Sequence, residues 1–429
     1  MQRKKGISFG TILMLAVTVI VLLGSAFVLG RMGGDELVQF DAAGLISAMH
    51  NSLAATDAPV ATPAPQSTIK TTSVTLAPNQ TQAAAVATQE PVIHTFSVTI
   101  GGQAAFRSDV SASAYRADTG MYDYAPIFEN IASEVYADLN LCTFSNLTGV
   151  AGTEFADIVT LPGALHGLKA MGMDRVLLNH GYALDKGSDG LDDMVNAVRN
   201  AGLDACGVNG VHLYTVNGVN IAILGYVETS TSKTASAVGE SGHLKWLNET
   251  TAREEIALAR NAGADVVIVS LWWGNENQET VTDHMRDTAL MLCQAGADII
   301  AGAGTDALLP VEWVDAVGSD GSVKRALAAY SMGTLISEKR ETRKQVCSAL
   351  LHLRISVNGA TGEMNIQSIS YTPTYIWKQE VSGNVIFRVL ASHKAAPEGM
   401  SQKQLEIMGR ALAEVEKVMA ESPAVKREN

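Results

Sequence analysis

The stretch from 298 to 312, DIIAGAGTDALLPVE, joins an apolar run to a glycine-rich loop. Loops that follow strands in α/β proteins commonly carry catalytic and metal-binding side chains. Between Gly302 and Pro310, however, the sequence has no histidine, and Asp306 is its only carboxylate. One carboxylate can act as an acid or a base, but it cannot hold a pair of metal ions by itself. The stretch therefore predicts a loop placed for chemistry that carries few of the groups chemistry needs.

Two other motifs in the chain point to chemistry only weakly. Residues GAGTDA fit the Gly-x-Gly-x-x-Ala fingerprint of dinucleotide binding, which must open a helix whose N-terminus meets a pyrophosphate. Pro310 follows shortly after this motif and argues against such a helix. Ser241 lies in GESGH, which is not the Gly-x-Ser-x-Gly turn of serine hydrolases. We therefore do not expect nucleotide binding or serine acyl transfer.

The composition predicts a globular core and disfavours nucleic acid as a partner. The chain has 429 residues, of which 47% are hydrophobic and 17% are charged. Its formal net charge is -13, and so acidic a protein repels phosphate backbones. Cys142, Cys206, Cys293 and Cys347 are widely spaced, which excludes zinc-ribbon and thioredoxin-type motifs. One or two disulfides remain possible, but buried free thiols are the favoured interpretation.

The N-terminal part predicts a membrane anchor and a stalk. Residues 9–30 are uncharged and mostly apolar, long enough for a helix to cross the hydrocarbon layer. Residues 1–8 form a basic tail that should remain cytoplasmic, which places the main domain outside a single-pass cell membrane. The rival interpretation is a cleaved signal peptide, whose apolar region is usually shorter. Residues 31–93, rich in Ala, Thr and Pro, predict a flexible stalk.

Residues 94–394 predict an α/β domain, with a C-terminal amphipathic helix within 395–429. Helix-then-strand units recur, and two of them share the joint Ala-Gly-Ala-Asp at 262–265 and 295–298. Asn217-Gly218 predicts a tight β-hairpin. The later segments favour antiparallel strands, and Ser401 opens the helix expected at 401–422. Helices should cover the sheets, with the chemistry at the strand ends.

The order of these segments resembles the CapA-type capsule synthesis proteins, which are associated with poly-γ-glutamate and have the calcineurin-like metallophosphatase fold. The resemblance covers roughly 94–393. It rests on six stretches: ADLNLCTFSNLTG (137–149), VLLNHGYALDKGSDGLDDMVNAVRNAGLDACGV (176–208), GVNIAILGYVE (218–228), ADVVIVSLWWGNEN (264–277), AGADIIAGAGTDALLPVEW (295–313) and YSMGT (330–334). It implies a sandwich of β-sheets flanked by helices. It also implies a pocket in which carboxylates and imidazoles hold two divalent cations.

At most of the pocket positions this chain departs from the family pattern. Gly-Asp is replaced by Gly101-Gly102, and Asn-Leu-Glu by Asn146-Leu147-Thr148. The family's Asn-Asn-His becomes His180-Gly181-Tyr182, and its His-Trp-Gly becomes Trp272-Trp273-Gly274. The family's Gly-His-x-His falls in Gly302-Ala303-Gly304-Thr305-Asp306. The positions that would line a remaining binding pocket are Gly102, Asn146, Thr148, Gly181, Tyr182, Trp272, Trp273, Gly304 and Asp306. Gly, Ala and Trp cannot coordinate a cation, so we expect no catalytic residue, no metal ligand and no cofactor.

A remodelled site is the alternative. His180, Asp185, Glu276 and Asp306 would then hold a divalent metal pair in a phosphoesterase or amidase. The simpler expectation is that His180 bonds to backbone at a strand end, that Asp185 caps the turn at Lys186-Gly187, and that Glu276 is solvated. His166 and His284 fall within expected helices and are most simply surface or interhelix residues. Of the two adjacent indoles, one could be exposed to stack on a sugar or apolar group, or both could fill the vacated cavity.

The favoured hypothesis is therefore a membrane-anchored, extracytoplasmic and non-catalytic protein of capsule or surface-polymer synthesis or export. Its expected partners are a cell-envelope polymer or the machinery that makes it, and the membrane through residues 9–30. The metal-dependent hydrolase is the second hypothesis. A third is a wall-spanning structural protein whose C-terminal helix recruits a partner.

Overall fold

The computed structural model describes residues 92–149, 159–318, 321–381, 383–422 and 424–428. These residues belong to one compact unit. The predicted anchor at 9–30 and nearly all of the predicted stalk lie outside them. Within the part of the chain that is described, no helix is both long and apolar enough to cross a membrane.

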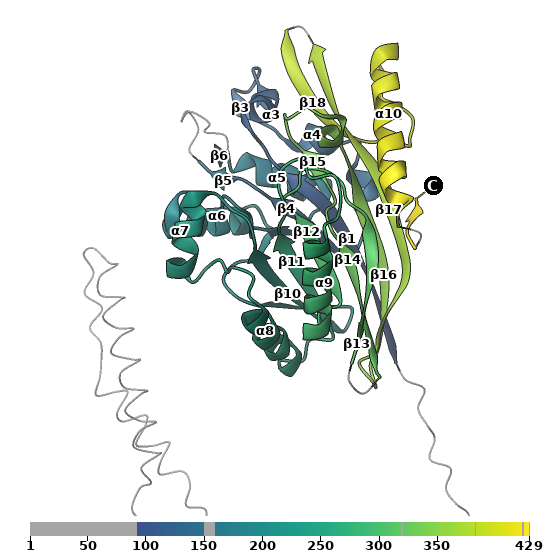
Figure 1. The fold of residues 1–429 in the computed structure, drawn as a ribbon. Coiled ribbons are helices and arrows are strands. Elements are labelled where there is room, and N and C mark those ends of the chain that lie inside the picture. Colours follow the sequence, from purple (N-terminus) through teal and green to yellow (C-terminus); the bar gives the residue numbers. More distant parts are fainter. Residues whose placement is uncertain (1–91, 150–158, 319–320, 382, 423, 429) are drawn as a thin grey trace, which may run out of the picture. The chain divides into compact units, whose positions relative to one another are not determined.

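Two large β-sheets form the centre of the molecule (Figure 1). The larger sheet runs β18-β17-β16-β1-β4-β7-β8, with β15 beside β1 and β19 beside β17. Its strands are β1 (Ile93–Ala104), β4 (Leu139–Phe144), β7 (Arg175–Leu177), β8 (Asp204–Cys206), β15 (Thr334–Ile336), β16 (Cys347–Asn358), β17 (Met364–Val381), β18 (Asn384–Ala391) and β19 (Lys426–Arg427). β1, β4, β7 and β8 are mutually parallel, whereas β16, β17 and β18 form an antiparallel extension.

The smaller sheet has the order β13-β14-β12-β11-β10-β9. Its strands are β9 (His212–Val216), β10 (Val219–Val227), β11 (Val266–Trp272), β12 (Ile299–Ala303), β13 (Val311–Val317) and β14 (Val323–Ala329). β10, β11, β12 and β14 are parallel, and their carboxyl ends meet at one edge. Two short pairs complete the strands, β2 (Tyr115–Arg116) with β3 (Met121–Tyr122), and β5 (Leu147–Thr148) with β6 (Val159–Thr160).

Helices connect the strands and cover the sheets (Figure 1). They are α3 (Ser108–Ser113), α4 (Ala125–Phe128), α5 (Gly163–Met171), α6 (Gly187–Asn200), α7 (Ser232–Ser241), α8 (Glu249–Asn261), α9 (Asp283–Ala295) and α10 (Gln402–Met419), with the short 3₁₀ turns η1 (Ala132–Glu134) and η2 (Arg343–Val346). α8 and α9 pack against one face of the smaller sheet. α10 packs on β16 and β17.

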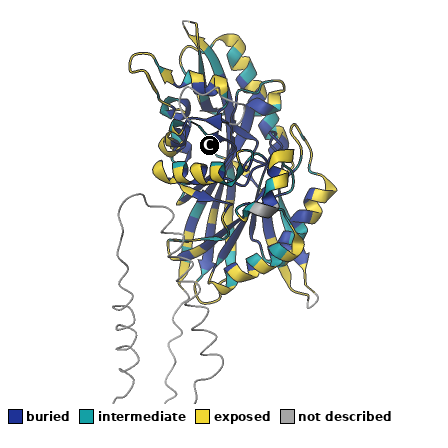
Figure 2. Ribbon diagram, turned by 90° about the vertical axis from the view of Figure 1, so that its left-hand side faces the viewer, coloured by how far each residue is buried: buried dark blue, intermediate teal, exposed yellow. Residues whose placement is uncertain are grey.

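The side-chain alternation of β11 explains how the smaller sheet is buried on both faces. Val266, Ile268 and Trp272 join the core shared with the larger sheet. Val267 and Val269 join the second core, under α8 and α9. Successive side chains point to opposite faces of a strand, so a strand covered on both sides needs an almost continuous apolar run, which in β11 only the buried Ser270 interrupts. Figure 2 shows the resulting layer of buried strands inside helices with exposed outer faces.

Several local predictions are confirmed. Asn217 and Gly218 both have positive φ and form the tight turn between β9 and β10. The Ser401 hydroxyl caps α10, and the Gln404 side chain completes a capping box. The four cysteines are free and buried. After β12 the chain enters a loop that leads into β13, so GAGTDA does not open a helix.

Candidate functional site

The family pocket positions gather at the carboxyl ends of the parallel strands. The loops after β7, β10, β11 and β12 enclose a hollow of about 220 Å³. Its lining includes Gly181, Tyr182, Trp272, Glu276 and Gly304. Of the nine predicted pocket positions, Gly181, Tyr182, Trp272 and Gly304 line this hollow. A binding role for them stays a prediction.

Trp272 fills space that the missing side chains would need. A Cβ added at Gly181 would lie 2.8 Å from the Trp272 Nε1, and one added at Gly304 would lie 3.1 Å from its Cε2. The indole is 5% exposed and packs edge-on against Tyr182, with 6.0 Å between ring centroids. Glycine at 181 and the indole at 272 therefore depend on one another, whereas Gly304 is also required by its positive φ and by the Trp273 carbonyl oxygen, 2.6 Å from an added Cβ.

Trp273 lies on the opposite face of the sheet. It is fully buried, stacks on Tyr330 at 5.6 Å and donates a 2.8 Å hydrogen bond from Nε1 to the Tyr330 carbonyl. Of the two alternatives for the indoles, an exposed ring is contradicted, because helices cover the outer face of this sheet as fully as the larger sheet covers the inner one. The alternative that both rings fill the cavity holds for Trp272 alone, since Trp273 belongs to the core on the other face. Neither ring is free to stack on a ligand, and both act as packing groups.

Lys339 places a fixed positive charge beside the pocket. Its Nζ lies 2.8 Å from the Glu276 carboxylate and 3.0 Å from that of Asp306. Tyr182 donates a 2.9 Å hydrogen bond to the same Glu276 carboxylate. Glu276 is half exposed, but it is held by these two groups and is not simply solvated as predicted. A single ammonium thus contacts both carboxylates and balances one of their two negative charges.

These contacts move the two carboxyl pKa values in opposite directions. Burial raises the pKa of Asp306 and outweighs the nearby charge of Lys339. For Glu276 burial also acts to raise the pKa, but hydrogen bonds and charge from Lys339, with the Tyr182 hydroxyl, lower it overall. The guanidinium of Arg107 lowers both values. The sequence motifs gave no indication that Arg107 and Lys339 lie beside the pocket, because neither residue occupies a metal-ligand position of the family pattern.

His180 is sealed in the interior. It is fully buried, and its Nδ1 accepts a 3.2 Å hydrogen bond from the Tyr182 backbone N–H, which agrees with the predicted backbone role. Burial lowers its pKa to about 3, opposed only weakly by the Asn146 backbone. The side chain is therefore neutral at physiological pH and has no access to solvent. Its neighbour Asn179 is equally committed, bonding the Tyr226 and Ser270 carbonyls and the Ser270 hydroxyl.

The remaining pocket positions have structural roles. Asn146 bonds both the N–H and the carbonyl of Phe106, which ties the loop after β4 to the loop after β1. The Thr148 carbonyl accepts a 3.4 Å hydrogen bond from Lys186. A Cβ at Gly102 would lie 2.3 Å from the Gly333 carbonyl oxygen, so backbone closes the place of the family's first aspartate.

Asp185 anchors a helix. Its carboxylate accepts hydrogen bonds from the hydroxyls of Thr231 and Thr234, at the start of α7. The prediction that it caps the Lys186-Gly187 turn is wrong, because the chain after β10 brings these hydroxyls against it. The minor predictions for His166 and His284 agree with the structure, since His166 is exposed and His284 meets Glu228 at the surface.

The residues present do not fit a pair of divalent cations. Within the described residues, no three His, Cys, Asp or Glu side chains lie together in a way that could hold a metal ion. The four candidate ligands of a remodelled site are all otherwise engaged. His180 is enclosed, Asp185 accepts hydrogen bonds from the start of α7, and Glu276 and Asp306 form ion pairs with Lys339. A cation here would have to displace the ammonium and would still lack an imidazole ligand.

Comparison with known proteins identifies the family. The sequence model of the bacterial capsule synthesis protein PGA_cap matches residues 97–339, more than half of the chain. The chain belongs to the PGA_cap family. It is 28% identical over 235 residues to the PGA biosynthesis protein CapA of Bacillus subtilis (strain 168), covering 51% of this chain and 57% of the relative. It is 25% identical over 256 residues to the capsule biosynthesis protein CapA of Bacillus anthracis, covering 56% of this chain and 59% of the relative. In each case the match therefore spans less than three fifths of the relative.

Solved structures similar to this PGA_cap member include a phosphatase and a phosphoesterase. One is a novel phosphatase from Mycoplasma pneumoniae, at a TM-score of 0.39 and 12% identity over 66% of this chain and 94% of the other. The other is the calcineurin-like phosphoesterase YfkN from Bacillus subtilis, with a TM-score of 0.38 and 12% identity. The match covers 76% of this chain and 99% of the other. The mixed α/β fold was predicted correctly. The narrower assignment to the calcineurin-like sandwich stays a prediction at these scores.

Proposed function

We propose that this PGA_cap protein serves capsule or surface-polymer synthesis or export without catalysing a hydrolytic step. The similarity to the PGA biosynthesis protein CapA of Bacillus subtilis and the capsule biosynthesis protein CapA of Bacillus anthracis supports the polymer role. We further propose that residues 9–30 anchor it in the cell membrane with the described domain outside. Its partners would be an envelope polymer or the proteins that assemble it, and not nucleic acid.

The contact of Lys339 with both Glu276 and Asp306 carries the non-catalytic part of the proposal. In two-metal hydrolases the cations activate water and stabilise the leaving oxygen. An ammonium supplies one positive charge but has no open coordination position for water, and its donors already face two carboxylates. Trp272 has no basic group, and His180 is enclosed, so neither side chain is available to activate a nucleophile in the pocket.

The test combines metal content, hydrolysis and polymer yield. The purified full-length chain, incubated with Mn²⁺, is expected to hold well under one metal per chain by elemental analysis and to leave p-nitrophenyl phosphate intact. In the native host, deletion of the gene should lower capsule polymer, and a Glu276→Gln copy should restore it as well as the unchanged gene. Glu276 is half exposed, so this variant should fold.

Two results would favour the metal-dependent hydrolase instead. One is two equivalents of bound metal together with ester hydrolysis that His180→Ala abolishes. The other is a Glu276→Gln copy that is present at normal amounts in the cell but restores no polymer. A deletion strain with unchanged capsule would contradict the polymer role itself and leave the question of catalysis to the first measurement.

A further inference from the structure

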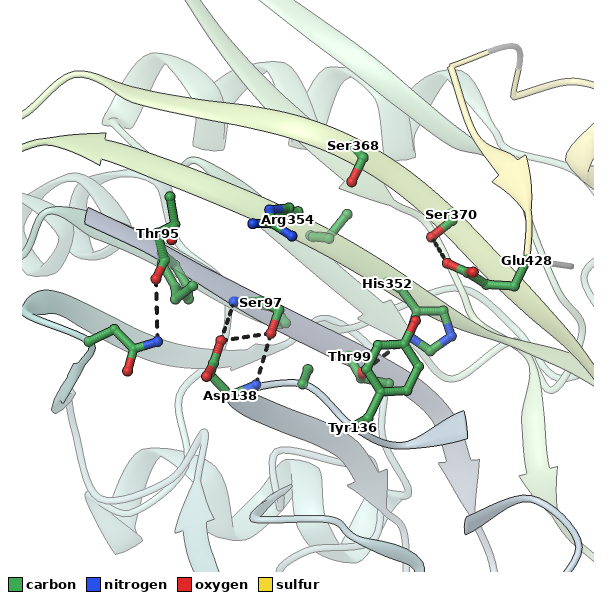
Figure 3. A pocket seen from close by; sticks show the side chains of 15 residues that line it. Thr95, Ser97, Thr99, Tyr136, Asp138, His352, Arg354, Ser368, Ser370 and Glu428 are labelled. Carbon is green, nitrogen blue, oxygen red and sulfur yellow. Dashed lines mark hydrogen bonds between the residues drawn. The ribbon is translucent and has the colours of Figure 1, made fainter. Parts of the chain in front are cut away.

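A second hollow on the described domain lies away from the candidate site and shares no lining residue with it. It has a volume of about 400 Å³, within the range of small-ligand pockets, and its floor is formed by β1, β16 and β17 (Figure 3). Phe96 and Val98 of β1 point into the core, so the alternate residues Thr95, Ser97 and Thr99 line the hollow. Polar side chains thus form the floor of what we term the β1–β17 groove.

An aromatic ring is held over this floor. Tyr136 stacks on His352 with 5.4 Å between ring centroids and an interplanar angle of 14°. His352 is itself fixed, because its two ring nitrogens lie 3.1 Å from the hydroxyls of Thr99 and Thr372. Tyr136 is nonetheless 62% exposed, since His352 covers only one side of its ring. The arrangement is a rigid, one-sided aromatic platform open to a ligand.

Polar groups around the platform are fixed in advance. Asp138 accepts hydrogen bonds of 2.8 and 2.7 Å from the backbone N–H and hydroxyl of Ser97. Glu428 accepts one from the Ser370 hydroxyl. Figure 3 shows the pairs Asp138–Ser97 and Glu428–Ser370 in the same groove, with Arg354 on β16, the strand between β1 and β17. Among the described residues no carboxylate lies within ion-pair distance of Arg354, so its guanidinium donors remain available.

The charges in the groove select against an acidic ligand. Asp138 and Glu428 contribute two negative charges and Arg354 one positive charge. Burial lowers the pKa of His352, so this imidazole is neutral near pH 7. The groove is therefore slightly negative on a protein whose net charge is already -13. A polyanion would be repelled here, whereas a neutral ligand rich in hydroxyls can use both carboxylates as acceptors and Arg354 as a donor.

We propose that the β1–β17 groove binds a neutral, pyranose-containing oligosaccharide. One sugar ring lies with its C–H face on Tyr136, and its hydroxyls bond Glu428, Asp138 and Arg354. An ordinary solvated sheet face would also carry alternating hydroxyls. It would not need an exposed tyrosine braced by a buried histidine, nor carboxylates held in place by neighbouring serines. The inference does not depend on the function proposed above.

The test titrates full-length protein with chitotetraose and cellotetraose by calorimetry, with γ-linked tetraglutamate as the acidic comparator. At least one tetrasaccharide should bind saturably, and tetraglutamate should not. Tyr136→Ala should weaken binding about tenfold or more, whereas Tyr136→Phe keeps the platform and most of the affinity. Glu428→Gln should also weaken it, by about tenfold, because a charge-assisted hydrogen bond is lost. Tyr115→Ala removes an exposed tyrosine elsewhere in the same domain and should change nothing.

Three outcomes would overturn the proposal. The first is that neither tetrasaccharide binds. The second is that a tetrasaccharide binds equally strongly to Tyr136→Ala and to Tyr115→Ala, which would place its site outside the groove. The third is that tetraglutamate binds and loses its affinity in Arg354→Gln, which would make the groove a site for an acidic polymer. Tyr136 and Glu428 lie at the surface or close to it, so far-ultraviolet circular dichroism of each variant suffices to verify folding.

Discussion

At the scale of single residues, the charged groups beside the pocket are paired with one another. Lys339 forms ion pairs with Asp306, whose side chain is only 8% exposed, and with Glu276 beside it. Asp306 also has a positive φ of 58°, a conformation that Asp and Asn tolerate better than most residues. The ammonium is therefore part of the folded structure, and removing it should leave a buried carboxylate without a counter-ion.

Lys339→Met is expected to lower the free energy of unfolding by about 3 kcal/mol, the usual cost of breaking one side of a buried ion pair. Adding Asp306→Asn should recover most of the loss, because asparagine keeps the backbone conformation and carries no charge. Lys378→Met is the matched control, since its pair with Asp109 is exposed and should be worth at most about 1 kcal/mol. Urea unfolding followed by tryptophan fluorescence measures all four proteins. Equal losses in the two single variants would contradict this account.

His180 should make the fold sensitive to acid. Its pKa is about 3 in the folded chain, against about 6.5 in an unfolded chain. Between these values only the unfolded chain binds the proton, so the contribution to stability is complete above about pH 6.5 and falls as the pH decreases.

In His180→Asn the side chain can still accept from the Tyr182 N–H, but it no longer titrates. The free energy of unfolding should therefore fall by about 2 kcal/mol less in the variant than in the unchanged protein between pH 7.5 and pH 5. His352 and His393, whose pKa values are also lowered, are present in both proteins and cancel. Parallel stability curves for the two proteins would show that His180 is not buried as described.

At the scale of elements, loops hold the pocket by attaching to helix ends. Thr231 caps α7 by accepting from the Thr234 N–H at 3.1 Å, and the Asp185 carboxylate accepts from both hydroxyls. The Gly181 carbonyl in turn accepts a 2.9 Å hydrogen bond from the Thr231 N–H. One short segment after β7 thus fixes the first turn of α7 and one wall of the pocket.

Asp185→Ala should destabilise the protein by about 1–2 kcal/mol and loosen this helix end first. Native-state hydrogen exchange should speed up for the amides of α7 and stay unchanged in α10. Ser401→Ala, which removes the cap of α10, should give the reverse pattern. Exchange that accelerates evenly through the domain in Asp185→Ala would exclude a local anchoring role.

At the scale of the whole molecule, the sequence predicts what is local or repeated. The alternation of helix and strand, the Asn217-Gly218 turn and the Ser401 cap all follow from neighbours along the chain. The ion pair of Lys339 with Asp306 cannot be predicted in this way, because the two residues are 33 positions apart and their loops meet only after the sheets have packed. The β1–β17 groove escaped prediction for a similar reason. Its residues look like ordinary alternating strand positions until β1, β16 and β17 are placed side by side.

The closeness of Gly102 to the Gly333 carbonyl has a consequence for any attempt to build a metal site into this domain. An aspartate at position 102 would place its Cβ 2.3 Å from the Gly333 carbonyl oxygen, so the neighbouring backbone would have to move. An asparagine at position 181 would collide with the Trp272 indole, so that ring would have to be made smaller at the same time. New ligands at these two positions would therefore have to be introduced together with changes in the residues that now fill the space.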